Sequence, residues 1–371
     1  MTEPLRVSVL GAGGTIAPAI VRDLAESDEV RAMRLLDLDG ERAEAVAHSH
    51  GGGKASAMAL DASGDDLAYA LSGCDVLVNS ASYRLNVNAM LACLAAGCHY
   101  IDLGGLYRVT GRQLELDAQF QRAGLVAVVG IGSSPGKTNL MALRAARELG
   151  GERLETVHVS AASRDLDPPP GDGLVLPYSL RTLIDELTLR PVAIRGGEAV
   201  ELDPLAPGGD VDYGDPIGVA PTIFTLHSEL RTFGQSFGCA EATFRLSLTP
   251  ALLARLRELA EATDEEIDAA ARSARPQSLR TVSVHRVDAT ANGREVTVRA
   301  LTGPSESWGL GGGVVSTAAP AAATVRLLAR GRVPGRGVLA PEAALDPDDV
   351  FPELERRGCR FSVESREAVR A

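Results

Sequence analysis

The feature that most constrains the fold is an alternation of short apolar runs with helix-like segments that begins at residue 5. Residues 5–26, LRVSVLGAGGTIAPAIVRDLAE, combine a strand-like run, a glycine turn and an amphipathic helical repeat. Five further strand-like runs follow before residue 133, most of them separated by helical periods. Such alternation predicts a parallel sheet covered by helices on both faces. The sequence therefore predicts an α/β protein whose residues 1–130 form a doubly wound, Rossmann-type dinucleotide-binding domain.

The glycine turn also predicts where the pyrophosphate of the cofactor binds. Gly11 permits a tight turn, and Gly13 or Gly14 lets the backbone approach the phosphates at the start of the helix. Ile16 replaces the third glycine of G-x-G-x-x-G, whereas the spacing G-x-x-G-x-x-A is kept with Ala17. The candidate cofactor-binding residues of the turn are Gly11, Gly13, Gly14, Thr15 and Ile16.

Asp37 closes the second predicted strand, where a carboxylate accepts hydrogen bonds from the ribose hydroxyls of the adenosine half. A carboxylate at this position repels a 2′-phosphate, so NAD is favoured as the cofactor and NADP is less favoured. Arg42 lies close enough in the sequence to weaken that preference. The alternative is that Asp37 caps the helix that begins near Gly40.

Polar residues at the ends of the next two strands are further candidates, because ligands bind at the carboxyl edge of an open parallel sheet. Asp61 would face the adenine or cap a helix. Asn79 would orient the cofactor or satisfy the loop backbone, with Ser80 beside it. Tyr83 would wall the substrate pocket on the nicotinamide side or pack in the core.

Residues 127–142, AVVGIGSSPGKTNLMA, come close to a phosphate-binding P-loop. The spacing argues against one, because Ile131 stands where that motif needs its first glycine. Pro135 also removes a backbone N–H from the loop. We therefore do not expect a nucleotide triphosphatase.

Composition limits the class of partner. The net charge of −12 argues against nucleic acid and against an anionic membrane surface. The start of the chain passes directly into a strand, and no apolar run approaches the length of a membrane span. The five cysteines form no C-x-x-C pair, which is typical of reduced thiols in a cytoplasmic protein without a metal site.

After Gly150 the pattern changes to hairpins and separate helices. Strand pairs are predicted around Gly196-Gly197 and around Asn292-Gly293, the latter a strong type I′ turn signal. Residues 131–310 are therefore predicted to form a second α+β domain with a mixed or antiparallel sheet. The apolar helix within residues 311–371 is predicted to complete the first domain.

Four segments resemble the saccharopine dehydrogenase-like oxidoreductases, and within that family most of all the lysine 6-dehydrogenases. They span nearly the whole chain in the family's order: LNVNAMLACLAAGCHYIDLGG (85–105), SPGKTNL (134–140), YSLRTLIDELTLRPVAIRGGE (178–198) and APAAATVRLLARGRVPGRGVLAPEAALDPDDVFPELERRG (319–358). The family carries a Pro-Gly-x-x-Asn segment after its nucleotide domain, which Pro135, Gly136 and Asn139 match. This match makes Asn139 a candidate for substrate binding.

The resemblance implies NAD(P)-linked oxidation of an amino group of an amino acid or amine, and a homodimer. The reverse chemistry, in which an amine is joined reductively to a carbonyl compound as in saccharopine reductases or carboxynorspermidine synthases, is the alternative. Ser134 stands where saccharopine reductases carry an acidic residue, so the substrate stays open. A catalytically inactive NAD-binding protein is the alternative from another functional class.

Oxidation of an ammonium group requires a base, because only the free amine can expel hydride. His227, in the loop TLHSELRTFGQSFG, is the first candidate, and a structural histidine bonded to backbone is the alternative. Glu229 in the same loop is a substitute base. Asp102 ends the fifth strand and would serve as base, orient the substrate ammonium or cap the next helix.

An amino-acid substrate also needs a cation for its carboxylate. Arg164, at the end of a predicted strand, is the first candidate and Arg231 is the second; each would otherwise be a solvated surface charge. We expect the nicotinamide ring near Asn79 and Tyr83, with His227 supplied by the second domain.

Overall fold

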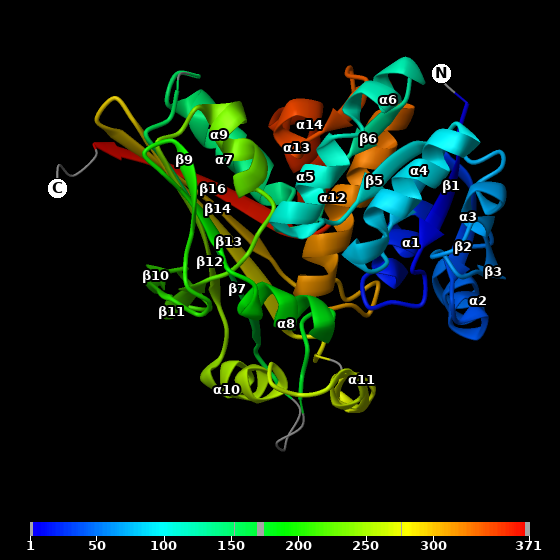
Figure 1. Ribbon diagram of the computed structural model, residues 1–371, viewed down its shortest axis with the longest axis horizontal. Helices are drawn as coiled ribbons and strands as arrows, with labels where there is room; N and C mark the ends of the chain where they lie inside the picture. The colour runs from blue at the N-terminus through cyan, green and yellow to red at the C-terminus, as the bar shows by residue number, and fades with distance from the viewer. Residues whose placement is uncertain (1–2, 152, 169–173, 276, 368–371) are drawn as a thin grey trace. The chain divides into compact units, whose positions relative to one another are not determined.

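The computed structural model describes residues 3–151, 153–168, 174–275 and 277–367 (Figure 1). The chain divides into two compact units, which we call unit 1 and unit 2. Unit 1 comprises Met1–Leu140 with Thr317–Leu354, and unit 2 comprises Met141–Ser316 with Glu355–Ala371.

Unit 1 is built on a seven-stranded sheet in which neighbouring strands run parallel. The strand order β15-β6-β5-β4-β1-β2-β3 confirms the predicted doubly wound fold, with its topological switch point between β1 and β4. The C-terminal tail adds β15 beside β6, a strand that the sequence did not reveal. The strands are β1 (Leu5–Leu10), β2 (Val30–Asp37), β3 (Ala55–Ala59), β4 (Val76–Asn79), β5 (His99–Asp102), β6 (Val126–Val128) and β15 (Gly337–Leu339).

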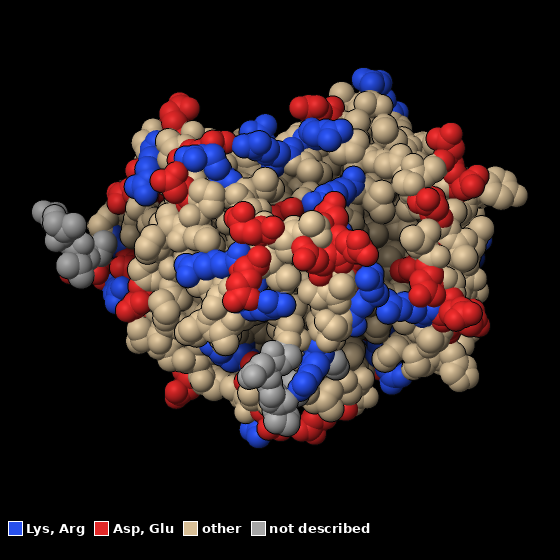
Figure 2. Space-filling model, turned by 60° about the horizontal axis from the view of Figure 1, so that its bottom comes forward, with Lys and Arg blue, Asp and Glu red and all other residues tan. Residues whose placement is uncertain are grey.

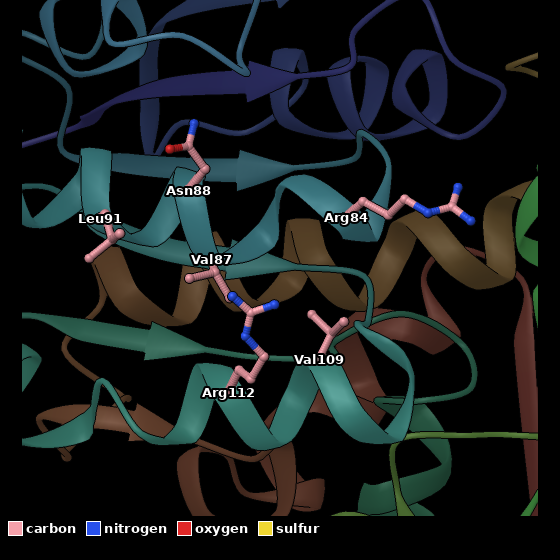
Figure 3. A pocket seen from close by; sticks show the side chains of 6 residues that line it. All are labelled: Arg84, Val87, Asn88, Leu91, Val109 and Arg112. Carbon is pink, nitrogen blue, oxygen red and sulfur yellow. The ribbon is translucent and has the colours of Figure 1, made fainter.

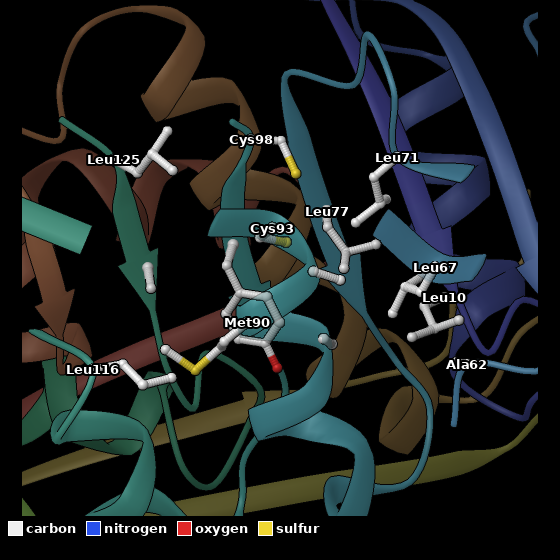
Figure 4. Close-up of a cluster of buried hydrophobic side chains, with 14 of the residues drawn as sticks. Leu10, Ala62, Leu67, Leu71, Leu77, Met90, Cys93, Cys98, Leu116 and Leu125 are labelled. Atoms are coloured by element: carbon white, nitrogen blue, oxygen red, sulfur yellow. The ribbon is translucent and has the colours of Figure 1, made fainter. Parts of the chain in front are cut away.

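Helices of unit 1 pack on this sheet through a large apolar cluster (Figure 4). Leu77 and Tyr100 come from the strands, and Met90 and Cys93 come from the α4 helix. The helical elements are α1 (Ala17–Ala25), α2 (Gly40–His50), α3 (Asp66–Ala70), η1 (Tyr83–Leu85), α4 (Asn86–Ala96), α5 (Leu106–Leu114), α6 (Asp117–Arg122), α13 (Pro341–Ala344) and α14 (Pro347–Glu355). Helices α7 (Lys137–Glu148) and α12 (Gly312–Ala329) each pass from one unit into the other.

The apolar helix α12 is held in unit 1 by a buried ion network. Arg326 donates to Asp23 on α1 at 2.7 Å and to Glu353 on α14 at 2.8 Å. By length and composition alone α12 could cross a membrane, but 78% of it is buried inside the protein, as in the core helix of a soluble protein. The burial of α12 therefore explains its apolar composition.

Unit 2 is built on a nine-stranded mixed sheet. Its main path is β10-β11-β12-β7-β13-β14-β16, and the β8–β9 hairpin joins it through β12. Only β12 and β7 run parallel among the described pairs of this sheet. The strands are β7 (Thr156–Asp165), β8 (Val192–Arg195), β9 (Glu198–Glu201), β10 (Pro207–Asp212), β11 (Val219–Phe224), β12 (Glu241–Ser247), β13 (Thr281–Ala291), β14 (Arg294–Thr302) and β16 (Cys359–Glu367), and the helices are α8 (Leu180–Thr188), α9 (Leu230–Phe237), α10 (Pro250–Leu259) and α11 (Asp264–Ser273).

Both predicted hairpins of unit 2 are confirmed. β8 pairs with β9 around Gly196-Gly197, and β13 pairs with β14 around a turn in which Asn292 and Gly293 have φ of 54° and 71°. The predicted assignment of residues 311–371 to the first domain differs from the structure at its end. β16 pairs with β14 along its whole length and so lies in unit 2, because its backbone completes the edge of that sheet. Residues 368–371 lie outside the described residues.

Candidate active site

The glycine turn of unit 1 has the geometry of a phosphate cradle. Gly11 has φ of +75°, and a Cβ there would lie 2.6 Å from the backbone of Ala81. At Gly13 a Cβ would lie 2.8 Å from Cβ of Arg42. Helix α1 begins after Ile16 without a side-chain cap, which leaves its amino end available to an anion. The turn thus fits the pyrophosphate of a dinucleotide, with Gly14 and Thr15 exposed on it.

Asp37 is half-buried and faces this turn. Its Oδ2 accepts from the N–H of Gly13 at 2.8 Å, and its Oδ1 accepts from the N–H of Asp39 at 2.9 Å. The residue that caps α2 is Asp39, which accepts from the N–H of Arg42 at 3.1 Å. The alternative role of Asp37 as a helix cap is therefore wrong. Arg42 is exposed and pairs with Asp39 at 3.5 Å.

Asp61 and Ser80 differ in how their polar atoms are used. The exposed Asp61 carboxylate accepts from both the N–H and the hydroxyl of Ser63, and these bonds lower its pKa. Asp61 therefore closes a local turn, while Asp65 occupies the cap position of α3. Ser80 Oγ is buried with no hydrogen-bond partner among the residues that the structure describes.

Asn79 is buried and fully engaged at the end of β4. Its Nδ2 donates to Asn86 Oδ1 at 2.9 Å and to Tyr100 Oη at 3.1 Å, and its Oδ1 accepts from the N–H of Ala81 at 3.1 Å. Three bonds within unit 1 support the structural alternative for this side chain, in which it fixes the loop that follows β4.

Asp102 is also buried and fully engaged, at the end of β5. Its carboxylate accepts from the N–H groups of Gly130 at 2.7 Å and Gly104 at 2.9 Å, and from Gln113 Nε2 at 2.5 Å. Burial raises its pKa, while the bonds from Gln113 and Gly130 oppose that rise. Asp102 thus ties together the loops after β5 and β6, and we call this connected set of buried residues the edge network: Asn79, Asn86, Tyr100, Asp102 and Gln113.

In the loop that resembles a P-loop, backbone N–H groups donate to carbonyl groups of the same loop. The N–H of Lys137 donates to Gly132 O at 2.9 Å, and that of Thr138 donates to Ser133 O at 3.2 Å. Asn139 is buried, where its Oδ1 accepts from the N–H of Gly136 and its Nδ2 donates to Glu342 Oε2, both at 2.8 Å. Asn139 therefore joins this loop to α13, and the loop offers no phosphate cradle.

A pocket of about 350 Å³ lies on unit 1 between α4 and α5, beside the η1 turn that carries Tyr83 (Figure 3). Tyr83 is half-buried, and the Arg84 guanidinium lies 5.2 Å from its ring centroid. In Figure 3 the Arg112 guanidinium turns toward Val87, whereas that of Arg84 points away from it. The lining residues are Arg84, Val87, Asn88, Leu91, Val109 and Arg112. On the face shown in Figure 2, acidic and basic side chains are interspersed.

In unit 2, His227 lies between two carboxylates and is 5% exposed. Its Nδ1 is 3.3 Å from Glu229 Oε2, and its Nε2 is 3.8 Å from Glu186 Oε1 on α8. Its ring stacks on Phe244 of β12 with centroids 3.5 Å apart. The Tyr178 hydroxyl donates to Glu186 Oε2. We call His227, Glu229, Glu186 and Tyr178 the histidine cluster.

Unsatisfied polar atoms gather in this loop. His227 Nε2, Thr225 Oγ1 and Ser228 Oγ are buried, and none has a hydrogen-bond partner among the described parts of the chain. Buried polar atoms are nearly always paired, so three orphans within four residues require an explanation. A loop built to exchange a proton or to receive a polar ligand supplies one.

The electrostatics of the cluster raise the pKa values of both His227 and Glu186. Burial disfavours the imidazolium of His227, but Glu229 and Glu186 outweigh burial and raise its pKa above 6.5. Burial raises the pKa of Glu186, and His227 and Tyr178 only partly oppose that rise.

The two candidate arginines are not part of this cluster. Arg164 bonds to Ser247, with Nη2 to Oγ at 2.8 Å. It lies on the sheet face opposite Phe244, because β12 and β7 pair 244 with 159 and 247 with 162, and side chains alternate along a strand. His227 packs on the Phe244 face, so the structure does not bring Arg164 and His227 together. Arg231 is exposed on α9.

Sequence reasoning missed Glu186 and Tyr178. A signal for Glu186 was present, because it falls on the apolar face of α8 with Leu183 and Leu187. An acid on the buried stripe of an amphipathic helix is rare unless it is paired. The pairing itself involves His227 some forty residues later, which no local pattern indicates.

The comparisons with known proteins agree with this architecture. The family model described as the saccharopine dehydrogenase NADP binding domain matches residues 7–128. A carboxyaminopropylagmatine dehydrogenase from Synechocystis is 26% identical over 266 residues, which are 68% of this chain and 65% of that protein. The match thus spans slightly less than two thirds of the relative's length.

Two solved structures share the fold over 98% of this chain. Saccharopine dehydrogenase (L-Glu forming) from Saccharomyces cerevisiae has a TM-score of 0.70 at 16% identity, with all of its chain covered. Homospermidine synthase from Legionella pneumophila, solved in complex with NAD, has a TM-score of 0.71 at 13% identity, with 91% of its chain covered. The nucleotide-binding domain thus matches the saccharopine dehydrogenase family model, and the chain shares the fold of these two solved structures.

Proposed function

We propose that this protein is an NAD-linked oxidoreductase that acts on a C–N bond of an amino acid or amine. The observation that carries the proposal is the enclosed imidazole of His227, held between two carboxylates with its Nε2 unsatisfied. Amine oxidation needs a hydride acceptor and a proton acceptor. The glycine turn of unit 1 fits the first, and the histidine cluster is suited to be the second.

The cofactor would be held by the turn from Gly11 to Ile16 and by Asp37. A side chain would meet the backbone of Ala81 at Gly11 and the side chain of Arg42 at Gly13, and the uncapped α1 helix would receive the pyrophosphate. When bound, NAD supplies the hydride acceptor. Asp37 would accept from the ribose hydroxyls in place of its bond from Gly13, so NAD is favoured over NADP.

The chain's own residues would handle the proton. In the oxidative direction His227 would take the proton that the substrate ammonium loses, with Glu229 keeping Nδ1 protonated. Phe244 holds the imidazole plane, and burial excludes water from the cluster. This assignment replaces Asp102, whose carboxylate is already occupied by three donors.

Reductive joining of an amine to a carbonyl compound is the second candidate. Both carboxylates raise the pKa of His227, which favours an imidazolium able to donate a proton near neutral pH. Carboxyaminopropylagmatine dehydrogenase, the relative found above, is named for a substrate of this joined kind. The same residues would serve, with the proton moving in the opposite direction.

The test is a paired assay. Purified protein is incubated with NAD or NADP and a panel of amino acids, diamines and guanidino amines across neutral to alkaline pH, and NADH formation is followed. The second arm follows NADH consumption with amines plus keto acids or aldehydes. Tight NAD binding without turnover in either arm would support the alternative of an inactive NAD-binding protein.

We also propose a homodimer that acts in the cytoplasm. The five cysteines are free thiols, as expected in a reducing compartment. Light scattering on the purified protein tests the dimer, since a monomer mass would contradict it.

A further inference from the structure

The two ring nitrogens of His227 have different neighbours. A carboxylate can only accept a hydrogen bond, so Nδ1, 3.3 Å from Glu229, carries a proton. Nε2 faces Glu186 Oε1 at 3.8 Å and has no hydrogen-bond partner among the described residues. A neutral ring with its proton on Nδ1 would direct a lone pair at a carboxylate. The arrangement is favourable only when one further proton lies between Nε2 and Oε1.

Glu186 is fixed from two sides. The Tyr178 hydroxyl donates to Oε2, which leaves Oε1 to face the imidazole. The N–H of Leu226, the residue before His227, donates to the backbone carbonyl of Glu186 at 3.3 Å. This bond ties the histidine loop to α8, so the distance between the two side chains is set by backbone and by the phenol.

We infer that Glu186 is a positioning residue for His227. Glu186 shares a proton with Nε2 of His227 and is itself oriented by Tyr178. The inference deepens the proposed function and rests on it only for the origin of the exchanged proton. In amine oxidation the shared proton must first leave the cluster; the substrate N–H bond then breaks, and the free lone pair on Nε2 takes that proton, which Nε2 then shares with Glu186 Oε1. The electron pair of the substrate C–H bond leaves as hydride to NAD, so charge and atoms balance.

The groups that face His227 come from three elements. Its own loop supplies Glu229, α8 supplies Glu186 with Asp185 beside it, and β12 supplies the uncharged ring of Phe244. Glu186 is thus the one carboxylate on the Nε2 side among the described residues. Removal of this carboxylate should therefore lower the pKa of His227.

The first readout does not depend on activity. The protein has six histidines, and the His227 resonance is identified in histidine-labelled protein by its loss in His227→Gln. In Glu186→Gln the pKa of His227 should fall by about one pH unit or more, because a nearby opposite charge favours the charged form by that order. Tyr178→Phe should lower it less, because Glu186 then holds its proton more readily.

The second readout is the pH profile of kcat/KM for amine oxidation, whose acid limb should move to lower pH in Glu186→Gln. Glu258→Gln is the matched control, an exposed carboxylate on α10 that pairs with Arg255. It should change neither readout.

An unchanged His227 pKa in a folded Glu186→Gln protein would overturn the inference and leave Glu186 as packing. If Glu186→Gln does not fold, the His227 resonance is followed in Tyr178→Phe, and an unchanged His227 pKa there overturns the inference. A His227 pKa that falls in Glu186→Gln, together with no turnover on any amine, would overturn the proposed function alone. Turnover on an amine, together with an unchanged His227 pKa in Glu186→Gln, would overturn this inference alone.

Discussion

Unit 1 and unit 2 each bury a polar network, and the two networks are satisfied to different degrees. In the edge network of unit 1, Asn79 makes three hydrogen bonds and Asp102 accepts three. In the histidine cluster of unit 2, His227 Nε2 is buried without a hydrogen bond, as are two nearby hydroxyls.

The difference separates a structural network from a functional one. Fully paired buried groups fix loops and stabilise one arrangement, as the edge network does for the loops after β4, β5 and β6. An enclosed imidazole whose Nε2 has no hydrogen bond, between two carboxylates, is suited to exchange a proton. We therefore expect mutations in the first network to change stability and mutations in the second to change chemistry.

The largest effect is expected for His227→Ala. Turnover in amine oxidation should fall by roughly 10²–10⁴-fold, the usual contribution of a general acid–base residue. NAD affinity should stay nearly unchanged, because the imidazole is not a cofactor contact in this account. Steady-state kinetics with NAD titration measures both, and full turnover in the variant would make His227 a structural residue.

Asp102→Ala tests the edge network of unit 1. It leaves Gly104, Gly130 and Gln113 without an acceptor, so the free energy of unfolding should fall by about 3 kcal/mol or more. Denaturant unfolding measures this loss. Turnover per folded molecule should change far less than in His227→Ala, and a loss of turnover with stability intact would return Asp102 to the role of base.

Asp37→Ala sharpens the account of unit 1. The wild-type protein should bind NAD more tightly than NADP, and removal of the carboxylate should narrow that gap by roughly tenfold, the value of a charge-assisted hydrogen bond. Binding titrations with both cofactors are the measurement. Equal affinities in the unmodified protein would contradict the assignment of Asp37.

A smaller effect is expected in the pH dependence of stability. The folded-state pKa of His227 is raised, so its imidazolium stabilises the fold fully below about pH 6.5, and this contribution is lost as pH rises through the folded value. The stability difference between wild type and His227→Gln should therefore be largest in acid and shrink toward alkaline pH. A difference that grows with pH would contradict the raised pKa.

The sequence predicted more of unit 1 than of unit 2. Strand–helix alternation and the glycine turn are local signals, so the parallel sheet and the position of Asp37 could be predicted from the sequence. The hairpin at Asn292-Gly293 was accessible for the same reason. β16 was missed because its partner β14 lies far away in the sequence and its mostly exposed side chains leave little apolar pattern.

The roles of single polar residues were harder to predict from the sequence than the fold. Asn79 and Asp102 stood at the correct edge of the sheet, yet only the tertiary structure reveals that their bonds are already used. His227 was found from chemistry and resemblance, but its partner Glu186 comes from another helix. Tertiary pairing, which no spacing rule encodes, decides which of these groups can exchange a proton.

The measurement that tests the central claim most directly is the pH profile of kcat/KM for amine oxidation in three proteins. In the wild type, the rate should rise with pH through an ionisation above 6.5, because the cluster must release a proton before it can accept one. Asp102→Asn should retain that ionisation, and His227→Gln should lose it. A profile that keeps the same ionisation in His227→Gln, or loses it in Asp102→Asn, would contradict the assignment of proton exchange to the histidine cluster.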